Sequence, residues 1–233
     1  CLMLEQMGIQ PECSHHESGP GQNEIDFRYS DPLTAADNAV TFRTVVRTVA
    51  ALNGLCANFS PKPLPDWDGN GMHINISARG SGQADMPAAV IAGILDKAAE
   101  ITLFLDPCEE SYRRLGHDKA PRYVTWSEEN RSQLIRIPAA VGENRRAELR
   151  SADSTANPYL AYALLIYAGL HGIKNGLVLP PATDLNLYTA PAETLKTLRT
   201  LPGSLAEAVT LADTSAFVKA HLPESVIRAY TRL

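Results

Sequence analysis

The chain has 233 residues, of which 45% are hydrophobic and 20% are charged, and its formal net charge is -5. This length provides ample material for a hydrophobic core, and the composition is ordinary for a globular protein. The acidic balance argues against a general nucleic-acid binder, which normally carries a basic excess.

The sequence shows no sign of export or membrane insertion. Its longest apolar run, 159–170, is too short to span a bilayer, and no secretory signal is present. The cysteines form neither a CxxC pair nor a metal-finger spacing, so we expect reduced thiols and a cytoplasmic location. They are Cys1, Cys13, Cys56 and Cys108.

One compact domain over residues 1–233 is the simplest interpretation, because the sequence contains no internal repeat and no convincing linker. The first residues, 2–8, resemble the end of a helix. We therefore expect this chain to be part of a longer polypeptide.

Two strands joined by a turn are predicted near the start of the chain. Residues 12–18 and 22–29 flank the turn-forming segment 19–21, and charged residues alternate with apolar ones in the second strand. A tight turn brings Glu17 and Glu24 together on one sheet face. Paired carboxylates repel unless a cation or a proton lies between them, and Mg²⁺ or Mn²⁺ prefers such oxygen ligands. A surface hairpin with ordinary charges remains the alternative.

A long helix is predicted next, with Asp31 as its N-cap and Pro32 at its first position. It ends at Asn53-Gly54, and a short strand is expected at 55–59. Apolar residues at helical spacing predict a stripe that faces the core: Phe42, Val45, Val46, Val49 and Leu52.

A glycine-containing segment, 68–71, leads into a predicted strand whose polar residues lie on one face. Glycine permits a close backbone approach to a ligand. His73, Asn75 and Ser77 alternate with isoleucines, and this polar row suits a metal ion or phosphate oxygens. A lone histidine in a strand is more often structural than a ligand, but the regular alternation after the glycines favours ligand binding.

Helices are predicted at 87–105 and 109–115, followed by a loop at 116–121 that we expect to reach across a site. Later, Asn157 caps a long apolar helix that starts at Pro158 and ends near Gly176. The remaining chain contains a proline-rich connection and no catalytic signature. Its predicted helices are 192–199, 205–212, 215–220 and 224–233.

The most informative stretch lies between these helices, where 130–138 and 145–150 read as two short strands. Side chains alternate across a strand, so Arg146, Glu148 and Arg150 share one face. If the strands are antiparallel neighbours, several guanidinium groups surround one carboxylate. Arginine grips phosphate or carboxylate oxygens and keeps its charge, although a solvated face with surface ion pairs is the open alternative.

Taken in order, these segments resemble the catalytic domain of glutamine synthetase over nearly the whole chain. No single motif is specific, but the ordered set is. The residues that carry the resemblance are His15-His16-Glu17, the segment 20–29, Pro61-Lys62-Pro63, Gly69-Asn70-Gly71-Met72-His73, the segment 130–138, and the segment 148–160.

The resemblance implies an α+β fold: a curved antiparallel sheet that carries ligands on its concave face, with helices packed on its outer face. It also implies the joining of glutamate and ammonia, driven by ATP as a substrate through γ-glutamyl phosphate, with two or more Mg²⁺ or Mn²⁺ ions. Neutralising and positioning phosphate is what metal ions and arginines do in phosphoryl transfer.

The resemblance assigns roles to residues of this chain. Glu17 and Glu24 ligate one metal ion, and His73 and Glu148 ligate the second. Gly69 and Arg114 hold the amino-acid end of glutamate, and Arg150 holds its γ-carboxylate. Arg131 and Arg150 are the catalytic residues. The residues that contact the nucleotide phosphates are Asn75, Ser77, Arg131 and Arg136.

Two departures from the family pattern stand out. Lys119 precedes Ala120-Pro121 where the family has a flap glutamate that binds ammonium, and the loop after Arg114 is one residue shorter. A lysine repels ammonium. The N-terminal β-grasp domain and the upstream metal-binding glutamates of the family are also absent from this chain, so we expect it to be inactive alone. The family forms its active sites between the subunits of a homo-oligomer.

Other functions stay open on the sequence alone. Lys119 and its shortened loop favour a γ-glutamyl ligase that uses another amine. A guanidino kinase would share the arginine-rich phosphate site, but the histidine–glutamate metal pattern speaks against it. A nucleotide- or glutamine-binding pseudoenzyme would bind these ligands without turnover.

Overall fold

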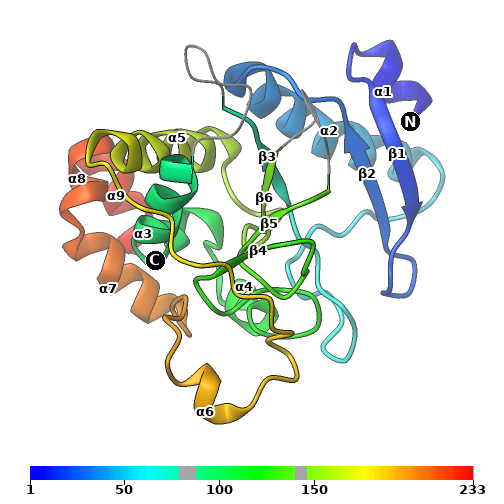
Figure 1. The fold of residues 1–233 in the computed structure, drawn as a ribbon. Coiled ribbons are helices and arrows are strands. Elements are labelled where there is room, and N and C mark those ends of the chain that lie inside the picture. Colours follow the sequence, from blue (N-terminus) through cyan, green and yellow to red (C-terminus); the bar gives the residue numbers. More distant parts are fainter. Residues whose placement is uncertain (79–87, 140–145, 233) are drawn as a thin grey trace.

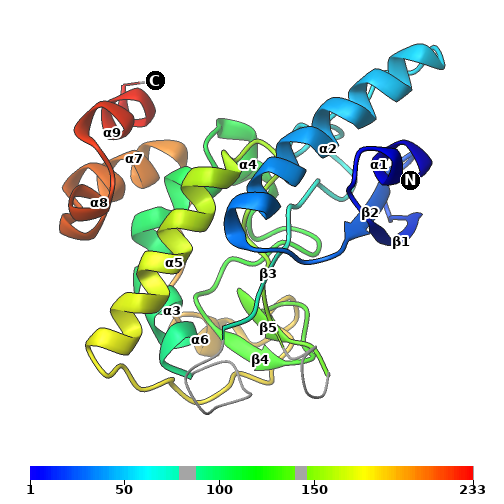
Figure 2. The same ribbon diagram turned by 90° about the horizontal axis from the view of Figure 1, so that it is seen from above.

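The computed structural model describes residues 1–78, 88–139 and 146–232. Figure 1 shows three parts: a two-stranded hairpin beside the N-terminus, a four-stranded sheet in the middle, and a group of helices on the opposite side. The N-terminus lies by the hairpin, whereas the C-terminal helices pack on the far side of the molecule (Figures 1 and 2). The expected α+β class is confirmed.

The hairpin follows a short helix, α1 (Leu2–Gln6), and consists of β1 (Pro11–His16) and β2 (Asn23–Phe27). The strands are antiparallel, with His15 opposite Glu24. The turn uses Gly21, whose φ of 70° lies in the left-handed region that glycine adopts without strain. The predicted hairpin is therefore present.

The central sheet has the strand order β3 (Ile74–Ile76), β6 (Ala147–Leu149), β5 (Ile135–Ile137) and β4 (Trp126–Glu128). The β3–β6 and β6–β5 pairs are antiparallel, as expected for the two arginine-bearing segments. The β5–β4 pair is parallel, and the sequence analysis did not predict β4 at all.

The register of this sheet separates its polar residues from its apolar ones. Ile74, Leu149 and Ile135 are paired across three strands and are at most 7% exposed, so they face the core. The neighbouring row joins Asn75, Glu148 and Arg136. Successive residues of a strand point to opposite faces, so this second row lies on the face away from the core. The sheet thus presents polar side chains on one surface.

Two helices start at the predicted caps. The Asp31 side chain accepts hydrogen bonds from two backbone N–H groups at the start of α2 (Pro32–Leu52), and Asn157 does the same for α5 (Pro158–Lys174). In both helices proline occupies the first turn, where its missing N–H costs nothing. The sequence located both starts correctly.

Helix α3 (Ala88–Leu105) is mostly apolar, apart from Asp96, Lys97 and Glu100, and it is buried along most of its length, as expected for a central helix. It packs against α5 at close range. A Cβ atom on Gly172 would lie 1.9 Å from the carbonyl oxygen of Ala89, and one on Gly93 would lie 2.1 Å from that of Ala168. Glycine at both positions lets the two backbones touch.

The remaining helices are short. α4 (Glu109–Arg114) follows α3, and α6 (Ala192–Leu195) lies in the long connection after α5. α7 (Leu205–Thr214), α8 (Ala216–His221) and α9 (Glu224–Thr231) cover α3 and α5, and they contribute Val218 and Ile227 to the common core. None of the helices in the described ranges is long and apolar enough to cross a membrane.

The predicted strand at 55–59 is wrong. Side chains, rather than a neighbouring strand, bind the backbone of this segment. The Asn58 Oδ1 atom accepts from the Ser60 N–H at 2.8 Å, Asn70 donates to the Ser60 carbonyl at 2.9 Å, and Ser154 donates to that of Phe59 at 2.6 Å. Such local bonds compete with a sheet ladder.

The predicted core-facing stripe of α2 is also wrong in part. The fully buried residues of this helix are Ala36 and Ala39, whereas Leu52 is 80% exposed. Figure 2 shows why: the later part of α2 extends away from the rest of the molecule. Pro87 and Arg145, at the ends of two predicted elements, lie outside the described residues.

The contact between α3 and α5 generates a stability prediction. Alanine normally stabilises a helix interior relative to glycine, but at position 172 its methyl group would collide with the Ala89 carbonyl. We expect Gly172→Ala to lower the free energy of unfolding by about 3 kcal/mol, as overpacking does. Urea unfolding followed by circular dichroism measures this.

The matched control is Gly203→Ala, because the nearest atom to its new methyl group is a flexible one, Glu207 Oε2, at 3.6 Å. Equal stabilities of the two variants would contradict the proposed backbone contact.

Candidate functional site

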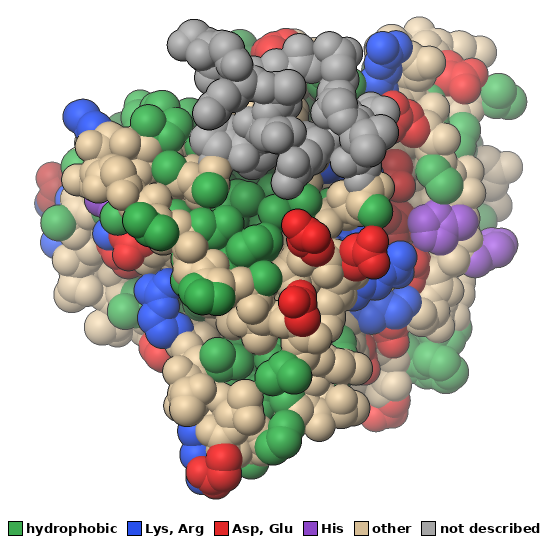
Figure 3. All heavy atoms as spheres, in the orientation of Figure 1, with side chains coloured by type: hydrophobic (Ala, Val, Ile, Leu, Met, Phe, Trp, Pro, Cys, Tyr) green, Lys and Arg blue, Asp and Glu red, His purple; other side chains and the backbone are tan. Residues whose placement is uncertain are grey.

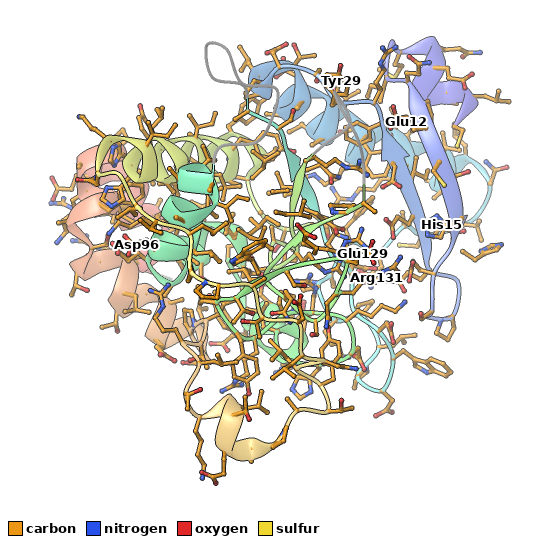
Figure 4. All side chains as sticks on the ribbon, in the orientation of Figure 1. Glu12, His15, Tyr29, Asp96, Glu129 and Arg131 are labelled. Carbon is orange, nitrogen blue, oxygen red and sulfur yellow. The ribbon has the colours of Figure 1, made fainter. Side chains whose placement is uncertain are left out.

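The candidate site lies between the hairpin and the polar face of the central sheet. Acidic and basic side chains gather there with histidine beside them (Figure 3). Figure 4 labels His15 on β1 and Arg131 on the loop before β5, on the two sides of this region. Burial is the largest cause that raises the pKa of Glu24 on β2, and the charge of Glu148 on β6 adds a smaller effect, so the two elements are close enough to interact.

Three side chains of the hairpin form one compact group, which we call the hairpin cluster: His15, Glu17 and Glu24. One ligand atom from each lies within 4.8 Å of the others. His15 Nε2 is 3.2 Å from Glu17 Oε1 and 3.8 Å from Glu24 Oε2. The predicted proximity of the two glutamates is therefore present. His15 was not predicted as a ligand, although its i, i+2 spacing to Glu17 places both residues on one face of the predicted strand.

The two glutamates of the hairpin cluster have opposite pKa shifts. A hydrogen bond from Lys119 lowers the pKa of Glu17 to about 2, against the effect of partial burial. Burial raises the pKa of Glu24, and the charges of Asp26 and Glu17 raise it further. Glu24 is thus the acid whose charge is disfavoured, and a divalent ion would stabilise that charge.

Lys119 places its own ammonium group against the hairpin cluster. Its Nζ lies 2.9 Å from Glu17 Oε2, donates to Ser18 Oγ at 2.6 Å, and is 3.6 Å from Asp68 Oδ2. An ion pair of 2.7 Å between Lys62 and Asp118 fixes the same loop. The residue that departs from the family pattern therefore sits directly on a predicted metal ligand.

Glu148 is the centre of the second group, the sheet cluster: His73, Arg136, Glu148 and Arg150. The carboxylate is 6% exposed and has three partners: His73 Nδ1 at 3.1 Å, Arg150 Nη1 at 2.9 Å and Arg136 Nε at 2.6 Å. The Arg136 contact is a close ion pair without the alignment of a hydrogen bond. The sequence prediction of guanidinium groups around one carboxylate describes this cluster.

Electrostatics fix the charge states of the sheet cluster. Burial opposes the charge of Glu148, but the hydrogen bond from His73 and the charges of Arg150 and Arg136 outweigh it and lower its pKa to about 2. Burial lowers the pKa of His73 in spite of the neighbouring carboxylate. At neutral pH the group thus holds a carboxylate and a neutral imidazole, the form that ligates metal.

Arg114 lies against the glycines that precede β3. A Cβ atom on Gly69 would lie 2.4 Å from the Pro61 carbonyl and 3.0 Å from Arg114 Cγ, and one on Gly71 would lie 2.8 Å from Arg114 Nη2. The guanidinium donates to the carbonyls of Ser151 at 2.6 Å and Arg150 at 3.2 Å. The predicted pair of Gly69 and Arg114 is therefore in contact, and glycine is needed there for this close approach.

The other residues assigned to the nucleotide lie at the margin of the site. Asn75 Oδ1 accepts from Arg146 Nε at 3.0 Å, and Ser77 is exposed just beyond β3. The Arg131 side chain is exposed, while its carbonyl accepts from Arg150 Nε at 3.1 Å.

A segment that the sequence analysis passed over also reaches the site. The carbonyl of Leu185 accepts hydrogen bonds from Asn130 and Gln133 at 3.0 and 2.9 Å, and Tyr188 donates to the Arg131 carbonyl at 3.5 Å. Burial raises the pKa of Tyr188. These contacts hold the loop that carries Arg131. The sequence around Leu185 and Tyr188 shows no helical or strand-like spacing of apolar residues that would have predicted them.

A cavity of about 430 Å³ lies beside this segment and the 116–121 loop. Its lining residues come from both: Gly116, His117, Asp118, Ala120, Arg122, Tyr123, Ser132, Leu187 and Tyr188. The cavity has the size of a small-molecule site and lies beside the loop that carries Arg131, but its lining residues are not those of the hairpin cluster or the sheet cluster.

The donor chemistry of both clusters fits divalent cations. Carboxylate oxygens with one imidazole suit Mn²⁺ or Mg²⁺. The hairpin cluster offers His15, Glu17 and Glu24, and the sheet cluster offers His73 and Glu148.

Comparisons with known proteins show which family the chain is similar to. The family model described as glutamine synthetase, catalytic domain, matches residues 1–233. The chain is 43% identical to a glutamine synthetase of Methanosarcina mazei and 40% identical to one of Mycolicibacterium smegmatis; these alignments cover 97% and 98% of this chain, but 54% and 55% of those proteins. The chain thus spans about half the length of these curated relatives.

Two solved structures have a fold similar to that of this chain. A structure of a GmaS/ADP complex superposes with a TM-score of 0.87 at 29% identity, and one of apo GmaS with 0.85 at 30% identity. Both cover 100% of this chain, and 57% and 56% of the respective GmaS chains.

The contact of Lys119 with Glu17 generates a prediction about metal affinity. A divalent ion at the hairpin cluster must compete with the ammonium group. We expect Lys119→Met to strengthen Mn²⁺ binding about threefold, since an exposed ion pair contributes about 0.2–1 kcal/mol. Calorimetric titration of the full-length protein with Mn²⁺ alone measures this.

Lys196→Met removes a surface ion pair with Glu193 and serves as the control. Glu17→Gln should weaken Mn²⁺ binding. Unchanged Mn²⁺ affinity in both Lys119→Met and Glu17→Gln would show that the hairpin cluster does not bind the ion.

Proposed function

The chain belongs to the glutamine synthetase catalytic-domain family, and from this premise we propose that the full-length protein uses ATP to join ammonia to the γ-carboxylate of glutamate. The intermediate of this reaction is γ-glutamyl phosphate. The single observation that supports the proposal most is that the hairpin cluster, with its two acids, lies near the sheet cluster, in which Arg136 and Arg150 surround Glu148. Phosphoryl transfer needs this combination of divalent-ion ligands and fixed positive charge.

In this proposal the metal ion and the arginines bind different parts of the substrates. When bound, Mg²⁺ or Mn²⁺ neutralises the charge of the triphosphate. Arg136 and Arg150 are held in fixed orientations by Glu148, at 2.6 and 2.9 Å, so they need little reorganisation when phosphate arrives. In this proposal Arg150 binds the γ-carboxylate of glutamate, and Arg131 and Arg136 bind phosphate.

Arg114 and Gly69 form the other end of the glutamate site in this proposal. The guanidinium is buried and donates to two backbone carbonyls, which fixes its plane. Because Arg114 and Arg150 are joined through the Arg150 carbonyl, a substrate with two carboxylates can bridge them. Glutamate has this chemistry.

Part of the active site is expected to come from sequence beyond this chain. The curated relatives are about twice as long, since the chain covers 54% and 55% of them. We propose that the full-length protein is a homo-oligomer whose sites lie between subunits, and that this chain alone has no activity.

A second candidate function is the ligation of another amine to glutamate. One observation favours it: Lys119 places a positive charge on Glu17, where it repels ammonium. In this alternative the acyl-phosphate chemistry is unchanged and only the acceptor differs.

The proposed reaction predicts phosphate release that depends on ATP, glutamate and a divalent ion together. We expect Glu148→Ala in the full-length protein to lower this rate at least about 100-fold, because it removes a metal ligand and frees both arginines. We expect this chain alone to form no glutamine.

Glu193→Ala, on the exposed helix α6, is the control and should keep full activity. Glutamine formation by the isolated chain would overturn the proposal that other subunits complete the site. Binding of ATP without any phosphate release would identify a pseudoenzyme.

The choice between ammonia and another amine rests on position 119. We expect Lys119→Glu to lower the KM for ammonium about tenfold, because it replaces a repelling charge by an attracting one. Initial rates with ammonium, methylamine and ethylamine compare the acceptors, and Lys196→Glu is the control. If the wild type uses ammonium efficiently and Lys119→Glu has the same KM for ammonium, Lys119 does not determine the amine acceptor.

A further inference from the structure

Two buried aspartates lie directly behind Arg114. Asp106 follows the end of α3, and Asp153 belongs to the loop after β6; both are 0% exposed. The backbone N–H of Asp153 donates to the carbonyl of Leu105 at 3.1 Å, so the loop and the helix end are held together. Neither aspartate takes part in the chemistry proposed above.

The charges around this pair do not balance if both acids are ionised. The groups that act on the Asp106 carboxyl are Asp153, Arg114, the Cys108 thiol and the Tyr112 phenol. Arg114 is thus the one cation among them, and its Nη1 is 3.5 Å from Asp106 Oδ1. Its short bonds go to backbone carbonyls instead. Two ionised carboxylates buried near a single, distant guanidinium would cost free energy, because burial disfavours each charge.

The hydrogen bonds of the two acids point to the same imbalance. Asp153 Oδ1 accepts from the Thr155 N–H at 2.7 Å. The Oδ2 atoms of both Asp106 and Asp153 are buried and have no hydrogen-bond donor in the described part of the chain. The two side chains are within hydrogen-bonding reach of each other, but an ionised carboxylate can only accept. One proton between them satisfies both orphan oxygens.

We propose that Asp106 is protonated at neutral pH and donates a hydrogen bond to Asp153, so that the pair carries one negative charge and positions Arg114. The pair then matches the single charge of Arg114. Burial and the neighbouring Asp153 raise the pKa of Asp106 well above its ordinary value, in agreement with this arrangement.

The consequence concerns the glutamate site, and it rests on the function proposed above. The guanidinium faces Asp106 on one side, and its Nη2 atom lies close to Gly71 on the other. Asp106 is therefore a positioning residue. It acts on the substrate only through Arg114, and its loss should weaken glutamate binding more than it slows the chemical step.

The first experiment detects the proton itself, without any substrate. Infrared difference spectra of the full-length protein at neutral pH, wild type minus Asp106→Asn, should contain the carbonyl band of a protonated carboxylic acid. Asp213→Asn, on the exposed surface of α7, is the control and should leave this band in place. A wild type without the band, or a band that persists in Asp106→Asn, would overturn the proposal.

The second experiment uses stability. An acid whose pKa is raised in the native state favours folding when protonated, so its contribution falls as pH rises from the ordinary value near 4 through the raised one. Relative to Asp106→Asn, the wild type should lose free energy of unfolding over that interval. A difference that does not change with pH would contradict a protonated Asp106.

The third experiment separates positioning from fold. Asparagine mimics the protonated acid and can donate to Asp153, whereas alanine cannot. We expect Asp106→Asn to keep the glutamate KM within about twofold, and Asp106→Ala to raise it about tenfold with a smaller change in kcat.

Equal damage by asparagine and alanine would show that Asp106 acts as an anion and would overturn the proposal. If the wild type does not use glutamate at all, the proposed function fails, while the infrared and stability results still decide the state of the acid pair.

Discussion

The buried carboxylate of Glu148 is the group on which the candidate site depends. A charge that is 6% exposed survives only when partners compensate for its lost hydration, and here His73, Arg136 and Arg150 do so. These partners come from three separate segments, so the requirement to neutralise one carboxylate fixes the relative positions of three strands. The same contacts leave two guanidinium groups oriented in advance.

The carboxylates of the hairpin also need a neighbouring positive charge, and here a lysine provides it. Glu17 and Glu24 repel each other, and Lys119 reaches Glu17 from the loop after α4, at 2.9 Å. Gln22 then ties the hairpin to the glycine segment, since its Nε2 donates to the Gly69 carbonyl at 3.0 Å. Polar contacts thus link the hairpin to the loops near the sheet, while Phe27 of β2 packs against Phe42 of α2.

Much of this could be predicted from the sequence, because local rules suffice for it. Strand alternation identified the faces of Glu148 and of the hairpin acids, and proline with a capping residue located α2 and α5. The errors have non-local causes. The 55–59 segment is shaped by side chains from distant loops, β4 is defined by its parallel pairing with β5, and Tyr188 reaches Arg131 through tertiary packing alone. The pairing of Lys119 with Glu17 likewise required the structure.

The fold also explains why Arg114 can be both buried and oriented. Its side chain crosses from α4 to the glycines before β3, and its donors meet carbonyls of the loop after β6. Any side chain at Gly69 would strike the Pro61 carbonyl at 2.4 Å, so the glycine keeps the path open. The acids behind the guanidinium keep its charge neutralised without binding its donors tightly. Arg114 is thus held between the acids on one side and the glycine segment on the other, and it is beside this segment that we propose the glutamate site.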